Sequence, residues 1–375
     1  MRKNIRQSKE MNDLCQQAFA FFRPDADLAS LVPLGNGRIN STWLITTAAN
    51  ENYVLQRLNP AVFPEPALVQ ENLCRVTAHL RANCCNSFQV LRSPNGETAW
   101  QDHSNAWWRL LSYLDGTRTL ASVSNSAQAQ EIGAALGRFH TILAKLPPPP
   151  LADTLPGFHN TPSYLADYDA LLPKACLPQA ADCRNFIAAR RADMRLLEEA
   201  RQQGTITEQT IHGDPKVGNF LFSLDGKRVV SLIDLDTVKP GLLLHDLGDC
   251  LRSCCNPRGE EVRHPEEIFF DCNLFAALLT GYFSQAAALL SDEDRRLLVA
   301  STRLISLELG LRFYSDYLAG SRYFKADHSK QNLFRARVQF ALVCSMENQY
   351  SNLMQMAAGC GLAPNSSTNQ EEEKR

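Results

Sequence analysis

The chain has 375 residues, of which 45% are hydrophobic and 21% are charged, and its formal net charge is −2. This composition is ordinary for a folded globular protein, the near-neutral charge argues against general binding to nucleic acid, and the length favours two lobes over one core. No apolar run approaches the roughly 20 residues that span a bilayer, and no hydrophobic leader follows the basic start, so we expect a cytoplasmic protein without a membrane partner.

The first part of the chain predicts an antiparallel sheet with one inserted helix. Apolar and polar residues alternate between turn signals within 28–57, which predicts two or three strands. Apolar residues then recur at helical spacing and predict a helix at about 66–82. A hairpin and a further strand are predicted within 88–114. We interpret residues 1–115 as an N-terminal lobe.

The pattern after residue 115 is mainly helical. One apolar face predicts a helix within 128–146, and the proline run behind it predicts a stiff connection. Further helices are predicted around 160–203 and across 264–358. A hairpin at 219–236 interrupts them. A β-rich part followed by an α-rich part predicts an α+β protein with a cleft between two lobes.

The domain organisation follows from this change of pattern. Residues 116–365 are expected to form a helical C-terminal lobe that carries a catalytic loop and a substrate site. The polar segment 366–375 is expected to be disordered. The sequence does not indicate the oligomeric state.

One loop concentrates chemically active side chains. Asp214, Lys216 and Asn219 stand at positions i, i+2 and i+5, and the following hairpin ends near Asp234. Carboxylate and amide oxygens can bind Mg²⁺, which proteins often share with phosphates and water. Such a set suits phosphoryl transfer, in which positioning and charge neutralisation do most of the work. An Asx turn that only caps the loop explains Asp214 and Asn219 singly, but it explains the whole set less well.

This spacing resembles the catalytic loop and the metal-binding aspartate of the protein-kinase superfamily. The loop "HGDPKVGN" is more similar to that of the aminoglycoside phosphotransferase family. The segments "LGNGRINSTWLI", "IDLDTVKPGLLLHDLGDCLR" and "LGLRFYSDYLAGSRYFK" resemble the N-acetylhexosamine 1-kinases of that family. The resemblance implies a protein-kinase-like two-lobe fold, with a β-rich N-terminal lobe containing one helix, a mostly helical C-terminal lobe, and ATP and Mg²⁺ as cofactors.

The resemblance also implies roles in catalysis. Asp214 would accept the proton of the substrate hydroxyl, and Lys216 would face the transferred phosphoryl group. Asn219 and Asp234 would hold Mg²⁺ on the phosphates of ATP. Asp246 would brace the catalytic loop rather than touch the substrate.

Contacts to the nucleotide are implied in the N-terminal lobe. Arg57 would stand where kinases usually keep a strand lysine, with Glu71 as its partner, although arginine changes the geometry of such a clamp. A strand-end cation and a solvated helix residue are the alternatives for these two positions. Leu114 would lie beside the adenine. The loop "GNGRIN", residues 35–40, would cover the phosphates, with Gly35, Asn36 and Gly37 as its contacts to the nucleotide.

By the same resemblance, Arg312 and Tyr323 would contact a sugar, or they are ordinary packing and surface residues. The implied reaction transfers the γ-phosphoryl group of ATP to the anomeric hydroxyl of N-acetylglucosamine or N-acetylgalactosamine and yields the sugar 1-phosphate. Two alternatives stay open. One is a kinase of another small alcohol, such as choline, ethanolamine, homoserine or an aminoglycoside, and the other is a catalytically silent nucleotide-binding module.

Overall fold

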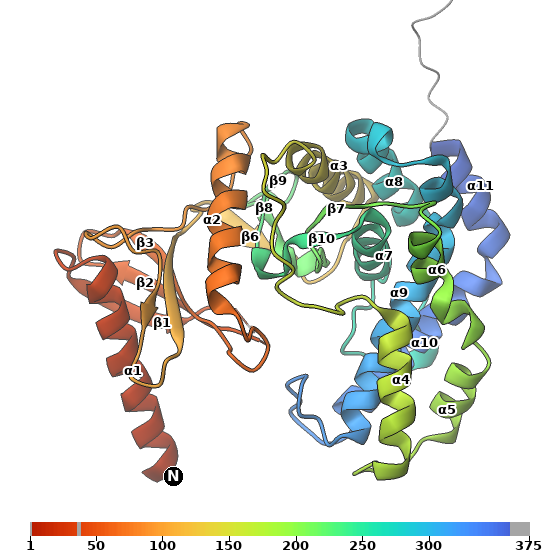
Figure 1. Ribbon diagram of the computed structural model, residues 1–375, viewed down its shortest axis with the longest axis horizontal. Coiled ribbons are helices and arrows are strands. Elements are labelled where there is room, and N and C mark those ends of the chain that lie inside the picture. Colours follow the sequence, from red (N-terminus) through yellow and green to blue (C-terminus); the bar gives the residue numbers. More distant parts are fainter. Residues whose placement is uncertain (1, 36–38, 361–375) are drawn as a thin grey trace, which may run out of the picture.

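The computed structural model describes residues 2–35 and 39–360, with side chains from Lys9 onward. Asn36 and Gly37 of the expected phosphate loop and the expected disordered tail, 366–375, lie outside the described residues. A sheet with two helices forms one part of the molecule, and a larger helical assembly forms the other (Figure 1). The predicted α+β fold with a β-rich and a helical part is therefore confirmed.

The N-terminal part is built on a five-stranded antiparallel sheet with the order β1-β2-β3-β5-β4. Its strands are β1 (Leu28–Pro33), β2 (Ser41–Thr47), β3 (Asn52–Arg57), β4 (Trp100–Gln101) and β5 (Trp107–Ser112). The hairpin predicted before β5 forms only in part, because Val90 makes a single bridge to Leu111 and the return strand β4 has two residues.

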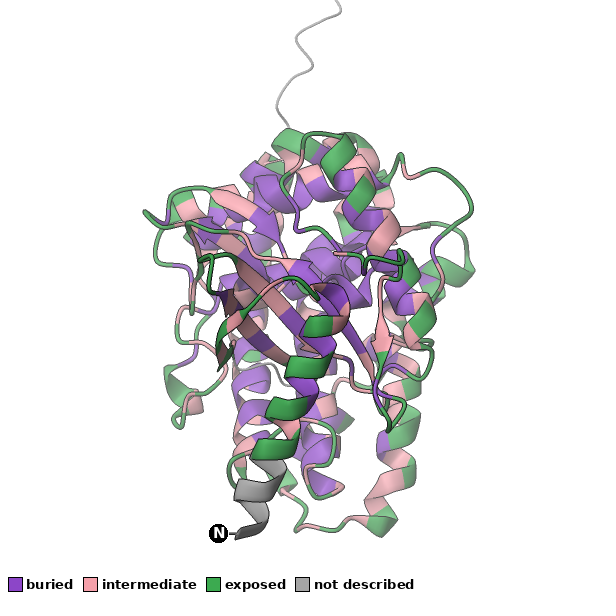
Figure 2. Cartoon of the chain, turned by 90° about the vertical axis from the view of Figure 1, so that its left-hand side faces the viewer, coloured by how far each residue is buried: buried purple, intermediate pink, exposed green. Residues whose placement is uncertain are grey.

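Two helices accompany this sheet. Helix α2 (Pro66–Ala82) matches the predicted helix at 66–82. Helix α1 (Arg2–Phe22) was not predicted, and it covers one face of the sheet, where Leu14, Phe19 and Phe22 pack on strand residues. Figure 2 shows the exposed outer side of α1 and the buried interior of the helical part behind the sheet. The opposite face of the sheet is left free to line a cleft.

The C-terminal part consists mainly of helices. They are α3 (Ser126–Leu143), α4 (Thr161–Leu171), α5 (Ala181–Ala188), α6 (Leu196–Gln202), α7 (Leu243–Cys254), α8 (Cys272–Ala286), α9 (Asp292–Leu318), α10 (Gln331–Asn348) and α11 (Tyr350–Cys360). Two small sheets lie among them. One has the order β6-β8-β9, with β6 (Thr117–Thr119), β8 (Phe220–Ser223) and β9 (Val229–Leu232), and the other pairs β7 (Glu208–Ile211) with β10 (Lys239–Leu242). The predicted hairpin at 219–236 is β8–β9.

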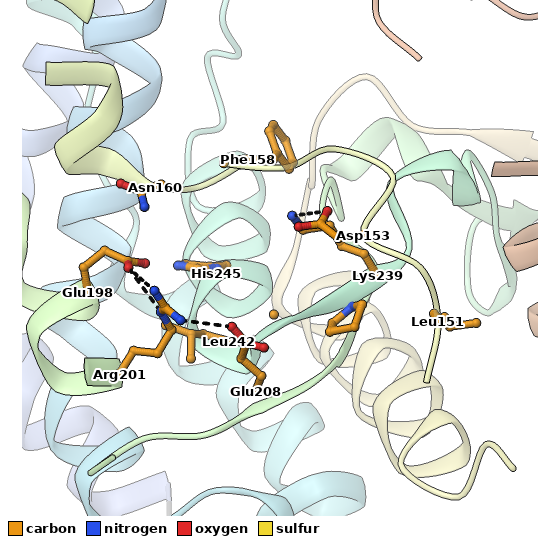
Figure 3. A pocket seen from close by; sticks show the side chains of 13 residues that line it. Leu151, Asp153, Phe158, Asn160, Glu198, Arg201, Glu208, Lys239, Leu242 and His245 are labelled. Atoms are coloured by element: carbon orange, nitrogen blue, oxygen red, sulfur yellow. Dashed lines mark hydrogen bonds and ion pairs between the residues drawn. The ribbon is translucent and has the colours of Figure 1, made fainter. Parts of the chain in front are cut away.

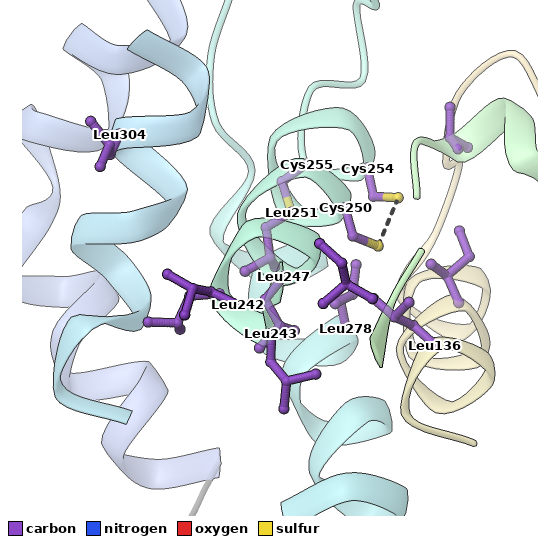
Figure 4. Close-up of a cluster of buried hydrophobic side chains, with 14 of the residues drawn as sticks. Leu136, Leu242, Leu243, Leu247, Cys250, Leu251, Cys254, Cys255, Leu278 and Leu304 are labelled. Atoms are coloured by element: carbon purple, nitrogen blue, oxygen red, sulfur yellow. Dashed lines mark hydrogen bonds between the residues drawn. The ribbon is translucent and has the colours of Figure 1, made fainter. Parts of the chain in front are cut away.

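Helix α7 lies in the core of the helical part. Its leucines Leu243, Leu247 and Leu251 pack with Cys250 and Cys254 in a closed apolar cluster (Figure 4). This helix was absent from the predictions although its leucines and cysteines recur at helical spacing, because its N-cap residue is Leu242, which gives no helix-start signal. It positions two buried aspartates beside the catalytic loop.

Helices α3 and α8 cross at very short range through glycines. A Cβ on Gly133 would overlap the carbonyl oxygen of Leu278, and a Cβ on Gly281 would overlap that of Gln130. The segment Cys272–Leu289, which contains α8, is long and apolar enough to cross a membrane by length and composition. It is the exception to the expectation that no run approaches that length, and here it packs against α3 as a core helix.

Candidate active site

A cleft of about 820 Å³ lies between the five-stranded sheet and the helical part. Its walls include Gln56 of β3, the connector from Ser112 to Leu114, and Asp214 in the loop after β7. The cleft thus draws on elements that are far apart in the sequence and contains most of the predicted site residues.

A buried carboxylate on α7 accepts hydrogen bonds from the backbone of the catalytic loop. Asp246 Oδ2 accepts the backbone N–H of His212 at 2.6 Å, and its Oδ1 accepts that of Gly213 at 2.8 Å. His140 Nε2 lies 2.8 Å from Oδ2. Burial would raise the pKa of Asp246, but the hydrogen bonds and charge of its histidine neighbours lower it below the ordinary value. The bracing role expected for Asp246 is confirmed.

The three predicted loop residues lie in contact with one another. The Lys216 ammonium donates to Oδ2 of Asp214, and Nδ2 of Asn219 donates to the same oxygen at 3.3 Å and to the Asp214 carbonyl at 2.7 Å. Burial would lower the pKa of Lys216, but the carboxylates of Asp214 and Asp234 raise it above its ordinary value. The lysine therefore stays charged and holds the Asp214 carboxylate in place.

Asp234 follows β9 in the left-handed conformation, with φ 63°, and lines the same cleft. The backbone N–H of Ile233 donates to the carbonyl of Asn219 at 2.9 Å, which places the two predicted metal ligands on neighbouring segments. The surrounding protein desolvates the Asp234 carboxylate, and with the Asp236 carboxylate nearby the pKa of Asp234 is raised.

The residues present fit a divalent cation that is shared with phosphates. The amide nitrogen of Asn219 donates hydrogen bonds to Asp214, so its amide oxygen can bind another partner such as a cation. No cluster of three or more His, Cys, Asp or Glu side chains suited to a metal occurs within 2–35 and 39–360. A site with few protein oxygens, completed by phosphate and water, is the arrangement that Mg²⁺ favours.

Arg57 and Glu71 do not form the expected phosphate clamp. Arg57 points to the α1 face of the sheet, where its Nε lies 3.4 Å from Asp102 Oδ2 and its guanidinium lies over Trp108. Glu71 is exposed on α2. The physical reason is the alternation of β3, which sends Gln56 to the cleft and the next residue to the opposite face.

Arg109 of β5 lines the cleft that Arg57 does not reach. Its Nη2 donates to Asp236 Oδ1 at 2.6 Å, and its Nε and Nη2 donate to Gln56 Oε1 at 2.9 and 2.7 Å. The side chain is 2% exposed, and its Nη1 has no hydrogen-bond partner among the described residues. Arg109 thus brings a buried cation with an unpartnered donor to the wall of the cleft that the five-stranded sheet forms. Asp236 also accepts from Asn40, at 2.6 Å, so it is a structural partner rather than a free metal ligand.

Two further predicted nucleotide contacts line the cleft. Gly35 has φ 71°, which glycine adopts readily, and stands at the edge of the expected phosphate loop. Leu114 lies in the connector between β5 and β6, and its carbonyl accepts a hydrogen bond from Thr117 Oγ1 at 2.6 Å. Contact of these residues with phosphate and adenine stays a prediction.

Arg312 and Tyr323 both line the cleft and lie close to each other. The Arg312 guanidinium lies 4.9–6.0 Å from the ring centroids of four aromatic residues, Phe158, Tyr164, Tyr323 and Phe324. Burial would lower the pKa of Arg312, but neighbouring Tyr164 and Glu308 raise it. The structure brings the two predicted substrate residues together and gives the arginine aromatic neighbours.

His159 and Glu308 were not anticipated from the sequence. His159 Nδ1 lies 3.0 Å from Glu308 Oε1, and its Nε2 lies 2.9 Å from the carbonyl oxygen of Gly213. Because both ring nitrogens face acceptors, the imidazole is doubly protonated. Burial would lower the pKa of His159, but Glu308 raises it, and the pKa of Glu308 is lowered although burial opposes the shift. This buried pair ties the catalytic loop to α9.

A second cavity of about 360 Å³ lies beside β10 and is lined by His245 (Figure 3). The ring of His245 stacks on His159, which lines the first cleft. The charges of the second cavity are already paired, with Lys239 Nζ 2.7 Å from Asp153 Oδ1 and Arg201 Nη2 2.8 Å from Glu198 Oε2. It contains none of the residues that the sequence predicts as functional. The larger cleft is therefore the candidate active site.

Comparisons with known proteins agree with this geometry. The model of the phosphotransferase enzyme family (APH) matches residues 30–277. Among solved structures, amicoumacin kinase hAmiN in complex with AMP-PNP, Ca²⁺ and Ami is similar with a TM-score of 0.63 and 14% identity, covering 91% of this chain and 96% of that chain. A microcompartment-associated aminopropanol kinase has a TM-score of 0.58 and 18% identity over 91% and 98% of the two chains. Choline kinase LicA from Streptococcus pneumoniae has a TM-score of 0.52 and 16% identity over 93% and 99%. At these identities the likeness shows the fold.

Proposed function

Because the chain belongs to the phosphotransferase enzyme family, we propose that it is a small-molecule kinase that uses ATP and Mg²⁺ to phosphorylate the anomeric hydroxyl of an N-acetylhexosamine. We choose a sugar as the acceptor because of Arg312. Its guanidinium lines the cleft and has no hydrogen bond or ion pair to the described residues. A cytoplasmic location belongs to the same proposal, and the twelve cysteines, all free thiols, suit a reducing compartment.

The residues of the chain divide the work of the reaction. Asp214 accepts the proton of the acceptor hydroxyl, and Lys216 neutralises the charge that gathers around it. Asn219 and Asp234 hold Mg²⁺, which, when bound with ATP, offsets the phosphate charge during transfer. Arg109 contributes the cation on the nucleotide side. Because an anomeric hydroxyl is somewhat more acidic than an ordinary alcohol, a carboxylate base suffices.

The position of Arg312 in the cleft favours a neutral substrate over a cation. Lys216 is paired with Asp214 and His159 with Glu308, whereas Arg252 is shared by Asp249 and Glu260. Arg312 adds a positive charge that makes no ion pair with the described residues. A choline-like or amine acceptor would be repelled by it, whereas a sugar offers hydroxyl and carbonyl oxygens to its N–H groups. The resemblance of the segment 309–325 to N-acetylhexosamine 1-kinases points the same way.

An acceptor panel tests the proposal. The protein is incubated with ATP and Mg²⁺ plus N-acetylglucosamine, N-acetylgalactosamine, choline, ethanolamine, homoserine or an aminoglycoside. ADP release is followed, and NMR identifies the phosphorylated oxygen. We expect turnover with the N-acetylhexosamines and phosphate on the anomeric oxygen. Asp214→Asn should lower kcat by about 100-fold or more while Mg·ADP binding persists. Turnover with amino alcohols alone would establish the runner-up, and ADP binding without any turnover would indicate a nucleotide-binding module.

A further inference from the structure

The acceptor side of the cleft contains a buried carboxylate that the proposed reaction does not use. Asp249 lies on α7, one turn after Asp246, lines the cleft and is 6% exposed. Its Oδ1 accepts two hydrogen bonds from Arg252, at 3.0 Å from Nε and 2.6 Å from Nη2. Its Oδ2 is buried and has no hydrogen-bond partner among the residues that the structure describes.

Neighbouring donors are already committed elsewhere. Arg252 Nη1 donates to Glu260 Oε1 at 2.5 Å, and the Lys216 ammonium donates to Asp214. Buried polar atoms in folded proteins nearly always have a partner, so an orphaned oxygen on the wall of a binding cleft indicates a donor supplied by the ligand. Burial and the nearby Asp214 carboxylate raise the pKa of Asp249 although Arg252 opposes the shift, so a ligand donor would relieve an electrostatic cost.

We propose that Oδ2 of Asp249 accepts a hydrogen bond from a hydroxyl group of the acceptor sugar, other than the hydroxyl that is phosphorylated. The inference rests on the proposed function. Asp249 lines the same cleft as Asp214 and Lys216, so an acceptor that occupies this cleft beside the base can meet this carboxylate as well. The two bonds from Arg252 fix the carboxylate plane and leave one oxygen for the ligand. Asp249 is therefore a specificity-determining residue.

The variant Asp249→Asn reverses the hydrogen-bonding character of this one atom. The two N–H groups of Arg252 select the oxygen of the new amide, so its NH₂ group replaces Oδ2 and an acceptor becomes a donor. Arg252 keeps its contact with Glu260, which limits damage to the fold. We expect the KM for the N-acetylhexosamine to rise about 10- to 100-fold, as for loss of a hydrogen bond to a charged group, with the KM for ATP unchanged.

Monodeoxy analogues of the accepted sugar identify the partner. The analogue that lacks the hydroxyl bound by Asp249 should be used equally well by wild type and Asp249→Asn, whereas the other analogues should show the full penalty. The matched control is Asp169→Asn on α4, because Asp169 also accepts two hydrogen bonds from an arginine, Arg191, but does not line the cleft. Thermal unfolding of both variants monitors the fold.

The outcomes separate the two proposals. Wild-type turnover together with an unchanged KM in Asp249→Asn, or an equal penalty on every monodeoxy analogue, would overturn the role of Asp249 alone. Absence of wild-type turnover with any hexosamine would overturn the proposed function and this inference with it. A penalty that one deoxy analogue abolishes would establish the contact and name the hydroxyl.

Discussion

Arg109 and Arg57 lie on neighbouring strands, but we predict that only the replacement of Arg109 weakens binding of Mg·ADP. Arg109 is buried at the cleft with a spare N–H donor, whereas Arg57 lies on the α1 face beside Asp102. We predict that Arg109→Lys weakens binding of Mg·ADP about tenfold or more, because lysine keeps the charge for Asp236 but lacks the planar fork that also holds Gln56. Calorimetric titration with Mg·ADP measures this without any acceptor.

The control is the same arginine-to-lysine substitution at Arg57 on β3. Arg57→Lys should leave the affinity for Mg·ADP within about twofold, since this side chain does not line the cleft. If Arg57→Lys weakened binding as much as Arg109→Lys did, the nucleotide side of the cleft would be wrongly assigned.

The contrast between Arg57 and Arg109 shows one piece of information that the sequence did not provide, namely which face of the sheet meets the cleft. Strand alternation alone separates residue 56 from residue 57, but it does not reveal which face meets the cleft. That depends on α1, which covers the other face through Leu14, Ala18 and Phe22. These residues do follow a helical spacing at the start of the chain, so the signal was present although the helix was not predicted.

At the scale of elements, the contact of α3 with α8 depends on glycine. We predict that Gly133→Ala lowers the free energy of unfolding by about 1–3 kcal/mol, because the new methyl group meets the backbone of Leu278, which cannot move aside alone. The gain in helix propensity from alanine, about 1 kcal/mol, opposes only part of this loss. Urea unfolding followed by circular dichroism gives the difference.

A glycine in another helix supplies the matched comparison. Gly359 lies on α11, and a Cβ at this position would meet no neighbouring atom within 4 Å, so Gly359→Ala encounters no obstacle. We expect it to be neutral or to stabilise the fold slightly. Equal effects of the two substitutions would show that the close crossing of α3 and α8 does not matter for stability.

Most elements with a clear apolar period were predicted from the sequence, but helix α7 was missed although it has one. Helix α2 and the hairpin β8–β9 follow apolar patterns that one buried face imposes, and their bounds match the prediction closely. Helix α7 has a helical apolar spacing, but it begins after Leu242, which makes no side-chain cap, and its polar residues are buried rather than solvated. Its contribution to the site, the carboxylates of Asp246 and Asp249, was only partly foreseen.

For the whole molecule, the sequence was sufficient for the fold class and for the residues of one continuous loop. Asp214, Lys216 and Asn219 lie within six positions, so local spacing already places them together. Partners that meet only after folding carry no such local signal. His159 and Glu308 are 149 positions apart, and neither stands in a motif that predicts the other.

This buried pair links the helical part to the catalytic loop and predicts how stability depends on pH. The raised pKa of His159 means that its contribution is fully present below the unfolded-state value of about 6.5 and is lost as pH rises through the higher folded-state value. The lowered pKa of Glu308 means that its contribution is present above about 4.5 and is lost as pH falls through the lower folded-state value. The pair should therefore stabilise the fold most between about pH 4.5 and 6.5.

The variant His159→Gln isolates this contribution. Removing one member of a buried pair costs about 3–5 kcal/mol, and here the difference in unfolding free energy from wild type should be largest near pH 6 and should shrink as pH rises further. Urea titrations at several pH values between 5.5 and 9 measure it. Repeating them at high salt should change the difference little, because buried charges are weakly screened. A difference that stays constant over this range would mean that His159 is neutral in the folded protein, so that one of its nitrogens does not donate to Glu308 or Gly213 as the geometry requires.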